Sequence, residues 1–316
     1  MADGLHVILG SGPVGCWIAR ALRQMNYRVR VVNRTGHRPK LLPEDVEVIA
    51  ADLADPANAG LVAKDAAVIY QAVGPPYHLW HELFPRLQKC ALQAAREVGA
   101  RYISIENLYM FDSSRPMTED SPICPISKKG VLRARMAEEV MAANERGEIR
   151  ATALRSSDYY GPGVLLSALG ERVFGNLLSG KKAQILGSPT IPHSFAYIED
   201  VGLSAAVLGT NDNAKGKVWI APHATANTQV EIIEIACSLL GIAPRMTTVS
   251  PLMLRLAGMF DPGARETVEM MYEFTRPFVV DSHRTQSAFG LKPTPIRDGI
   301  ESTLSWYREY RYLTRR

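Results

Sequence analysis

The chain has 316 residues, of which 47% are hydrophobic, and a formal net charge of +4. This length exceeds one typical domain, and the apolar fraction is sufficient for a full core. The excess charge is spread along the chain, apart from a C-terminal arginine cluster (Arg308, Arg311, Arg315 and Arg316) that we interpret as a solvated tail. We therefore expect no nucleic-acid interface, and no run of about eighteen apolar residues predicts a membrane span.

The cysteines and histidines give no sign of a disulfide framework or a metal site. The four cysteines are widely spaced and form no C-x-x-C pair (Cys16, Cys90, Cys124 and Cys237), which indicates reduced thiols. His78 and His81 have helical spacing but no third ligand nearby, so no metal is expected. The N-terminus lacks a basic segment followed by a long apolar run, and the sequence predicts a soluble cytoplasmic protein.

Residues 5–34 show the strongest local pattern in the chain. A strand at 5–9 runs into a G-x-G-x-x-G turn, a helix with apolar residues on one face, and a second strand at 28–32. Such a unit is typical of dinucleotide-binding folds, because glycines allow a tight turn and close approach of a pyrophosphate to the helix N-terminus. The predicted cofactor contacts here are Gly10, Gly12, Pro13, Val14 and Gly15.

Strands and helices continue to alternate after this unit. We expect strands at 46–50, 67–71, 102–105 and 152–155, with intervening helices ending near 62 and covering 80–98 and 130–144. This alternation predicts an α/β fold: a Rossmann-type doubly wound parallel sheet with helices on both faces.

The pattern loosens after residue 163. We predict helices at 165–178, 199–208 and 227–240, and strands at 183–186, 193–197, 218–221 and near 278–280. Residues 1–163 form the expected dinucleotide-binding core, to which 193–222 return, while 164–192 and 223–316 are expected to form mainly a smaller C-terminal substrate lobe. Its apolar residues could line a pocket or simply pack the helices (Met253, Leu254, Met259, Phe260, Met270, Met271 and Phe274).

Several motifs in this order resemble the extended short-chain dehydrogenases/reductases, the NAD-dependent epimerase/dehydratase-like family. They are the glycine turn, Asp52-Leu53, Ala72-Val73-Gly74, Leu108-Tyr109, Arg155 with the segment 160–163, and the segments 194–201 and 289–296. The resemblance implies that Asp52 and Leu53 flank the adenine, and that Ala72, Val73, Gly74, Ser156 and Tyr159 also contact the cofactor. It further implies a monomer or a homodimer formed through the helices 80–98 and 130–144.

The chain departs from this family where the catalytic Tyr-x-x-x-Lys should begin the helix near residue 130. The best register puts Lys129 in the tyrosine position and Arg133 in the lysine position, so Lys129 is both a catalytic and a cofactor-binding candidate. The expected catalytic serine or threonine after the strand at 102–105 is also replaced, leaving Asn107 as the polar candidate there. The glycine turn itself is shorter than in most extended members.

The proton that accompanies hydride transfer must therefore come from another group. The alternatives are Tyr109, Tyr159, Tyr160, Lys129, a bound water or a phenol on the substrate. The candidate catalytic residues are Lys129, Arg133, Tyr109, Tyr159 and Asn107.

The end of the strand at 28–32 indicates which dinucleotide binds. NAD-binding proteins usually have an acidic residue here, whereas this chain has Asn33 and Arg34, followed by Arg38. Arg34 can pair with a 2′-phosphate that a carboxylate would repel, which predicts NADP(H). The alternative is a solvated basic loop.

We therefore expect an NADPH-dependent reductase of a ketone or aldehyde on an apolar, aromatic or polyketide-like small molecule. The first alternative is a nucleotide-sugar-type epimerase or dehydratase that keeps its nicotinamide bound. The second is a non-catalytic NADP-sensing protein that regulates a partner, because a fold alone does not fix a function.

Overall fold

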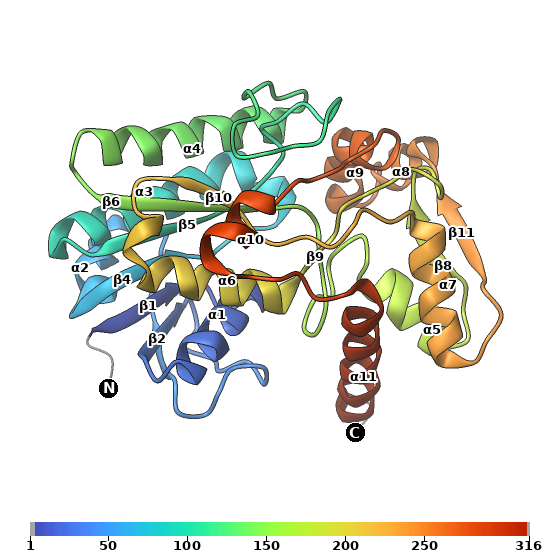
Figure 1. Ribbon diagram of the computed structural model, residues 1–316, viewed down its shortest axis with the longest axis horizontal. Helices are drawn as coiled ribbons and strands as arrows, with labels where there is room; N and C mark the ends of the chain where they lie inside the picture. The colour runs from blue at the N-terminus through green and yellow to red at the C-terminus, as the bar shows by residue number, and fades with distance from the viewer. Residues whose placement is uncertain (1–3, 315–316) are drawn as a thin grey trace.

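The computed structural model describes residues 4–314 and is built on a seven-stranded sheet (Figure 1). The strands lie in the order β10-β6-β5-β4-β1-β2-β3, and every neighbouring pair is parallel. Their bounds are β1 Leu5–Leu9, β2 Arg28–Asn33, β3 Glu47–Ala50, β4 Ala66–Gln71, β5 Arg101–Asn107, β6 Arg150–Ser156 and β10 Val218–Ile220. Because all the strands are parallel, their carboxyl ends share one edge, where ligands bind in such sheets.

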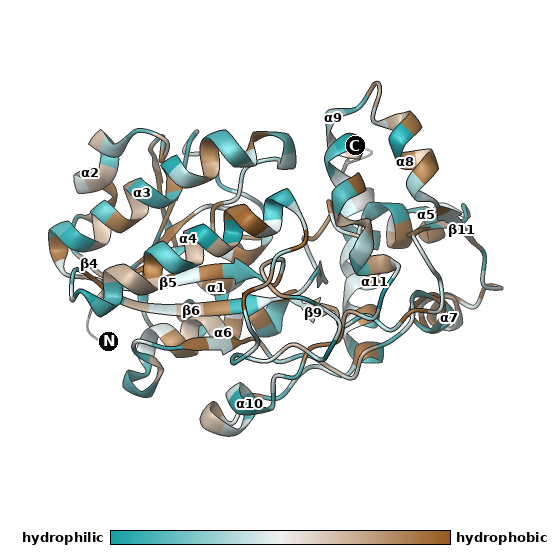
Figure 2. Ribbon diagram, turned by 90° about the horizontal axis from the view of Figure 1, so that it is seen from above, coloured by the Kyte–Doolittle hydropathy of each residue, from teal (hydrophilic) through white to brown (hydrophobic). Residues whose placement is uncertain are grey.

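Helices cover both faces of the sheet. On one face lie α1 (Pro13–Gln24) and α6 (Ile198–Thr210), and on the other α2 (Ala59–Ala63), α3 (Trp80–Val98) and α4 (Lys128–Glu145). The buried residues of α1 and α3 are mainly apolar, and α3 alternates between teal and brown in Figure 2. The predicted doubly wound Rossmann-type fold is therefore confirmed.

Much of the rest of the chain packs around a second apolar cluster, which lies beside the sheet. Two short parallel sheets pair β8 (Ala183–Leu186) with β11 (Met246–Val249), and β7 (Tyr159–Tyr160) with β9 (Ala196–Tyr197). The helices of this part are α5 Asn176–Leu178, α7 Gln229–Leu240, α8 Pro251–Ala257, α9 Pro262–Thr267, α10 His283–Phe289 and α11 Ile296–Thr314, with a 3₁₀ segment at Val268–Phe274. Arg315 and Arg316 of the predicted basic tail lie outside the described residues.

Helix α7 illustrates how local sequence sets element boundaries. The Thr228 hydroxyl accepts a hydrogen bond from the Glu231 backbone N–H, and the Glu231 carboxylate accepts one from the Thr228 N–H at 2.7 Å. Gly241 ends the helix in the left-handed conformation, with φ of 68°. This reciprocal cap and glycine stop confirm the helix predicted at 227–240, with its start at Gln229.

Some expected elements are wrong because tertiary contacts override the local pattern. Of the helix predicted at 165–178, only 171–178 is helical: the Glu171 N–H bonds back to the Leu165 carbonyl, and a Cβ on Gly170 would collide with that carbonyl. The strand predicted at 193–197 is reduced to Ala196–Tyr197, and the segment near 278–280 makes only isolated bridges. Strand β11 was not predicted.

Two segments distant in sequence return to the sheet. Strand β10 pairs with β6, and Gly202 of α6 lies so close to Trp17 of α1 that a Cβ there would be 2.6 Å from the tryptophan backbone. The Phe289 ring of α10 packs on Trp219 of β10 with ring centroids 4.7 Å apart. The exact division into core and substrate lobe stays a prediction. Among residues 4–314, no helix is long and apolar enough to cross a membrane.

Candidate functional site

The glycine turn joins β1 to α1 at the carboxyl edge of the sheet. Gly10 has φ of 112°, and a Cβ there would lie 2.8 Å from the Val73 backbone of the turn after β4. A Cβ on Gly15 would collide with the Gly10 carbonyl. These two glycines therefore hold the turn against its neighbours.

Gly12 has a different role in the same turn. A Cβ on this residue would meet no atom within 4 Å, and Gly12 precedes the first turn of α1, with Pro13 at the helix start. The first N–H groups of a helix have no partner within the helix and attract anions. The open space in front of Gly12, beside Val14 and Gly15, fits the pyrophosphate of a dinucleotide.

The loop after β7 borders this turn. The Trp17 indole N–H of α1 donates a 2.9 Å hydrogen bond to the Pro162 carbonyl, and a Cβ on Gly163 would lie 3.8 Å from the Pro13 side chain. The motif at 160–163 is thereby fixed next to the predicted cofactor contacts on α1.

Asn33 at the end of β2 organises the following loop. Its amide N–H₂ donates to Ser11 Oγ at 3.0 Å and to the His37 carbonyl at 2.8 Å, while its oxygen accepts from the backbone N–H groups of Thr35 and Gly36. Arg34 is exposed and has no ion pair among the described residues. The structure thus leaves the Arg34 guanidinium available to an anionic ligand.

Arg38 is engaged within the protein instead. Its guanidinium donates to the Pro43 carbonyl at 2.7 Å and to the Val46 carbonyl at 2.6 Å, which fixes the loop before β3. After β3, Asp52 is exposed and caps the Ala54 N–H, whereas Leu53 is buried. The sequence 72–74 follows β4 directly, and the Ala72 N–H bonds to the Leu9 carbonyl of β1.

Lys129, which occupies the expected tyrosine position at the start of α4, is fully buried and bound to acidic residues from a distant segment. Its ammonium group donates to Glu266 Oε2 at 2.5 Å and Glu269 Oε1 at 2.6 Å, and it lies 5.2 Å from the centre of the Tyr77 ring. The neighbouring Lys129 ammonium lowers the pKa of Glu266. Lys129 therefore joins α4 to α9 and the 3₁₀ segment that follows it.

Arg133, one turn further along α4, is also buried. Its guanidinium donates to the Ile105 carbonyl at 3.3 Å and lies 4.5 Å from the centre of the Phe84 ring. Its Nε has no hydrogen-bond partner among the described residues. Burial lowers the pKa of Arg133, and the charges of Glu106 and Tyr159 oppose this shift.

The predicted tyrosines occupy two separate hydrogen-bonded pairs. The Tyr109 and Tyr77 hydroxyls are 2.6 Å apart, and the Ser156 hydroxyl donates to the Tyr159 hydroxyl at 3.1 Å. Asn107 accepts a long bond of 3.4 Å from the Tyr109 N–H. Tyr77 follows β4, Asn107 and Tyr109 stand at and after the end of β5, and Ser156 and Tyr159 at and after the end of β6. The structure therefore gathers them at the same sheet edge as the glycine turn.

A buried group outside the candidate catalytic and cofactor-binding residues lies beside these residues. His193 Nε2 is 3.2 Å from Asp158 Oδ2, and His193 Nδ1 is 3.1 Å from the Glu273 backbone carbonyl. The His193 ring is stacked parallel to Phe274 with centroids 5.0 Å apart. Burial, followed by the nearby Asp158 carboxyl, raises the pKa of Glu273 well above its usual range.

The sequence does not indicate that these residues meet, because they come from three distant segments. Asp158 stands in the motif from 155 to 163, where the candidates are Ser156, Tyr159 and Tyr160, and Glu273 lies in a stretch whose apolar residues could line a pocket or pack the helices. A carboxylate inside an otherwise apolar stretch is the signal that could have indicated Glu273, since such groups are rarely buried without a partner.

A second buried histidine, His223, has a structural role. Its Nε2 accepts a hydrogen bond from the Ser157 N–H at 3.3 Å, and its Nδ1–H donates to the Ala221 carbonyl at 2.6 Å. Burial lowers the pKa of His223 to about 4. The neutral ring therefore connects the end of β6 to the end of β10.

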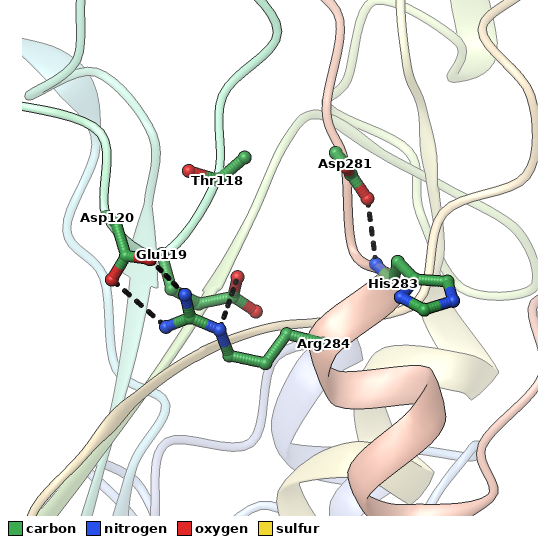
Figure 3. Close-up of a pocket in the computed structure, with 6 residues that line it drawn as sticks. All are labelled: Thr118, Glu119, Asp120, Asp281, His283 and Arg284. Atoms are coloured by element: carbon green, nitrogen blue, oxygen red, sulfur yellow. Dashed lines mark hydrogen bonds and ion pairs between the residues drawn. The ribbon is translucent and has the colours of Figure 1, made fainter.

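A cavity of about 400 Å³ lies elsewhere, between the loop that follows β5 and the start of α10 (Figure 3). Arg284 pairs there with Asp120 and lies 3.8 Å from Glu119. The other lining residues are Thr118, Asp281 and His283. None of the predicted site residues lines this cavity.

The fold and these motifs define a nicotinamide-dependent class of proteins. The chain belongs to the NAD dependent epimerase/dehydratase family, whose model matches residues 7–220, so the resemblance seen in the sequence is confirmed. Members of this family are oxidoreductases, epimerases and dehydratases, which supports enzymatic function in general.

Two curated relatives are similar to this chain. A 2'-dehydrokanamycin reductase from Streptomyces kanamyceticus is 29% identical over 68% of this chain and 60% of its own length, so this chain matches less than two thirds of that enzyme. A dTDP-glucose 4,6-dehydratase from Mycolicibacterium smegmatis is 23% identical over 96% of this chain and 93% of its own length. These two relatives differ in reaction.

Solved structures agree with the fold. A UDP-glucuronic acid 4-epimerase from Bacillus cereus in complex with NAD has a TM-score of 0.78 and 17% sequence identity, covering 97% of this chain and 99% of that chain. At this identity the likeness demonstrates a shared architecture.

Proposed function

We propose that this protein is an NADPH-dependent reductase that converts the ketone or aldehyde group of a small, mainly apolar molecule into an alcohol. The reductase proposal depends most on one combination. The glycine turn is suited to a dinucleotide, while the family's catalytic tyrosine and lysine are absent. Reduction requires one hydride and one proton, whereas epimerases and dehydratases of this family must also return the hydride and move further protons.

The choice of NADPH rests on Arg34. This guanidinium is exposed at the end of β2, has no acidic partner among the described residues, and lies next to Asn33, which carries no charge. An arginine can bind the 2′-phosphate through two charge-assisted hydrogen bonds. The structural neighbour named above was solved with NAD, so the phosphate preference is proposed for this chain alone.

The residues that would hold the cofactor are distributed along the sheet edge. Gly12, Val14 and Gly15 would accept the pyrophosphate, Arg34 the 2′-phosphate, and Asp52 with Leu53 the adenine. Ala72, Val73 and Gly74 would border the middle of the cofactor, and Ser156, Tyr159 and Arg133 its nicotinamide half. When bound, the cofactor supplies the hydride.

An epimerase or dehydratase is the first alternative, favoured by the solved neighbour and by the curated dehydratase. A non-catalytic NADP sensor is the second, favoured by Lys129, whose ammonium is tied to Glu266 and Glu269 rather than free for proton transfer. NADPH oxidation in the presence of keto sugars, aromatic ketones or quinones identifies a reductase. Conversion of a nucleotide sugar without net NADPH oxidation identifies an epimerase or dehydratase, and NADPH binding with neither reaction identifies a sensor.

The cofactor claim is tested by the charge reversal Arg34→Glu. Loss of a charged hydrogen-bonded pair is worth about 1.5–3 kcal/mol, so NADPH affinity should fall on the order of 10- to 100-fold while NADH affinity changes little. The matched control is Arg28→Glu, because Arg28 is an exposed arginine at the opposite end of the same strand. Equal losses for both cofactors in Arg34→Glu would refute phosphate pairing.

A further inference from the structure

We propose that Asp158 and Glu273 form a proton-sharing carboxyl pair that gives the substrate oxygen the proton which the absent tyrosine would supply, with His193 as a positioning residue. This inference rests on the proposed reductase function. It assigns a donor outside the five catalytic candidates suggested by the sequence.

The geometry around His193 requires a proton in this cluster. The Glu273 carbonyl can only accept hydrogen bonds, so the His193 Nδ1 that lies 3.1 Å from it carries a hydrogen. In the neutral ring Nε2 is then a bare lone pair, 3.2 Å from the Asp158 oxygen. Two lone pairs at this distance repel each other, so a proton must reside on Nε2 or on Asp158.

Asp158 also faces a second carboxyl group. The Glu273 side chain is buried and interacts with the Asp158 carboxyl and the Tyr272 hydroxyl, and neither carboxyl has an ion pair with lysine or arginine among residues 4–310. His193 is the cationic group beside the pair when its Nε2 carries the proton, and one imidazolium can balance the charge of only one of two neighbouring carboxylates. Four buried polar atoms of this cluster lack a well-oriented hydrogen-bond partner among the described residues: Asp158 Oδ2, His193 Nε2, Tyr272 OH and Glu273 Oε1.

Exposure determines which carboxyl could reach a substrate. The Asp158 side chain is 17% exposed, whereas Glu273 is only 1% exposed. Asp158 lies between β6 and β7, directly before Tyr159, at the sheet edge where the cofactor contacts converge. Asp158 is therefore the donor, and Glu273 keeps the proton available to it.

The tyrosines beside this pair, Tyr109 and Tyr159, are poor proton donors. Burial raises the pKa of Tyr109 well above its usual value, and the charges of Tyr77, Glu273 and Asp158 raise it further. Burial also raises the pKa of Tyr159. A phenol with a raised pKa gives up its proton less readily than a neighbouring carboxyl group.

The proton transfer balances with the hydride that NADPH supplies. As the carbonyl carbon gains the hydride, its π electrons move to oxygen, the O–H bond of Asp158 breaks and a new O–H bond forms on the product. NADPH becomes NADP⁺, and the pair regains one proton from solvent. The titratable groups that face the pair are His193, Tyr77, Tyr109, Tyr159 and Tyr272.

The first test needs no substrate. Infrared spectra of the full-length protein near neutral pH, recorded in H₂O and D₂O, should show the carbonyl stretch of a protonated carboxyl group. This band should disappear in Glu273→Gln and persist in Glu234→Gln, a change at an exposed glutamate of α7. Absence of the band from the unmodified protein, or its persistence in Glu273→Gln, would overturn the proposal.

The second test separates this inference from the proposed function. Asp158→Asn should slow NADPH oxidation on the order of 100-fold or more, shift the pH profile and leave NADPH affinity unchanged, whereas Asp298→Asn, a change at an exposed aspartate of α11, should stay within a few fold of the unmodified protein. Turnover of Asp158→Asn at the original rate would refute only the donor. No turnover by the unmodified protein on any substrate would refute the reductase, and the donor role with it.

Discussion

The glycine turn after β1 and the first turn of α4 are both at the carboxyl edge of one sheet, yet they are built in different ways. In the glycine turn the backbone would form the proposed binding surface, and the absence of side chains at Gly10, Gly12 and Gly15 is what matters. At the start of α4 the side chains matter instead: Lys129 and Arg133 are buried there and replace the residues expected from the family.

This difference explains why one region keeps the family pattern and the other does not. A backbone cradle tolerates almost no substitution, because any Cβ meets another backbone atom or the ligand. A side-chain site can be rebuilt if another group supplies the same proton. Binding and chemistry can therefore diverge separately within one fold.

The largest expected effect comes from adding single methyl groups to the glycine turn. Gly15→Ala should destabilise the protein by about 3 kcal/mol, since its Cβ would collide with the Gly10 carbonyl. Gly12→Ala should leave the melting temperature within a few degrees of its original value, because nothing in the protein lies near that Cβ, yet abolish measurable NADPH binding. Thermal melts and cofactor titrations on both variants check this.

The pair of variants separates folding from binding. If Gly12→Ala binds NADPH as well as the unmodified protein does, the space before α1 does not hold a pyrophosphate. If Gly15→Ala is fully stable, the turn adjusts and the backbone account is wrong.

A smaller effect is expected on the side-chain region. Lys129→Met should lower the free energy of unfolding by about 2–3 kcal/mol, because it leaves Glu266 and Glu269 without their shared cation, and the 28% and 25% exposure of these carboxylates limits the loss. Urea unfolding measures the change. Lys128→Met, at an exposed neighbour on the same helix, is the control. Restored stability in Lys129→Met with both glutamates changed to glutamine would confirm the charge argument.

The effect that is smallest per pH unit is the dependence of stability on acid. His223 is neutral in the fold, with a pKa of about 4, and protonates near pH 6.5 when unfolded. Stability should therefore fall as the pH drops from about 6.5 toward 4, by up to about 1.4 kcal/mol per unit. Burial lowers the pKa of His6 to a similar value, so His223→Gln should reduce this slope without abolishing it. His283→Gln, at an exposed histidine, should leave the slope unchanged.

The core of the fold could be predicted because its signals are local. The glycine turn, the alternating strands and helices, and the cap and stop of α7 depend on residues a few positions apart. The helix predicted at 165–178 failed for the opposite reason: its apolar residues serve the second cluster through irregular backbone around Gly170.

The chemistry of the site could be predicted only in part. That Lys129 and Arg133 stand in unusual positions is visible in the sequence, but the partners of Lys129 are 137 and 140 residues away. The contact between Asp158, His193 and Glu273 likewise depends on three segments meeting in space. No periodicity or spacing records such a meeting, and the tertiary structure alone provides it.

Asn33 has a consequence for how this protein could change over evolutionary time. Its amide both donates to Ser11 and His37 and accepts from Thr35 and Gly36. An aspartate, the residue typical of NAD-binding relatives, could accept but not donate, so the loop would lose two of its ties. A lineage that placed an aspartate at this position would therefore also have to rebuild the loop.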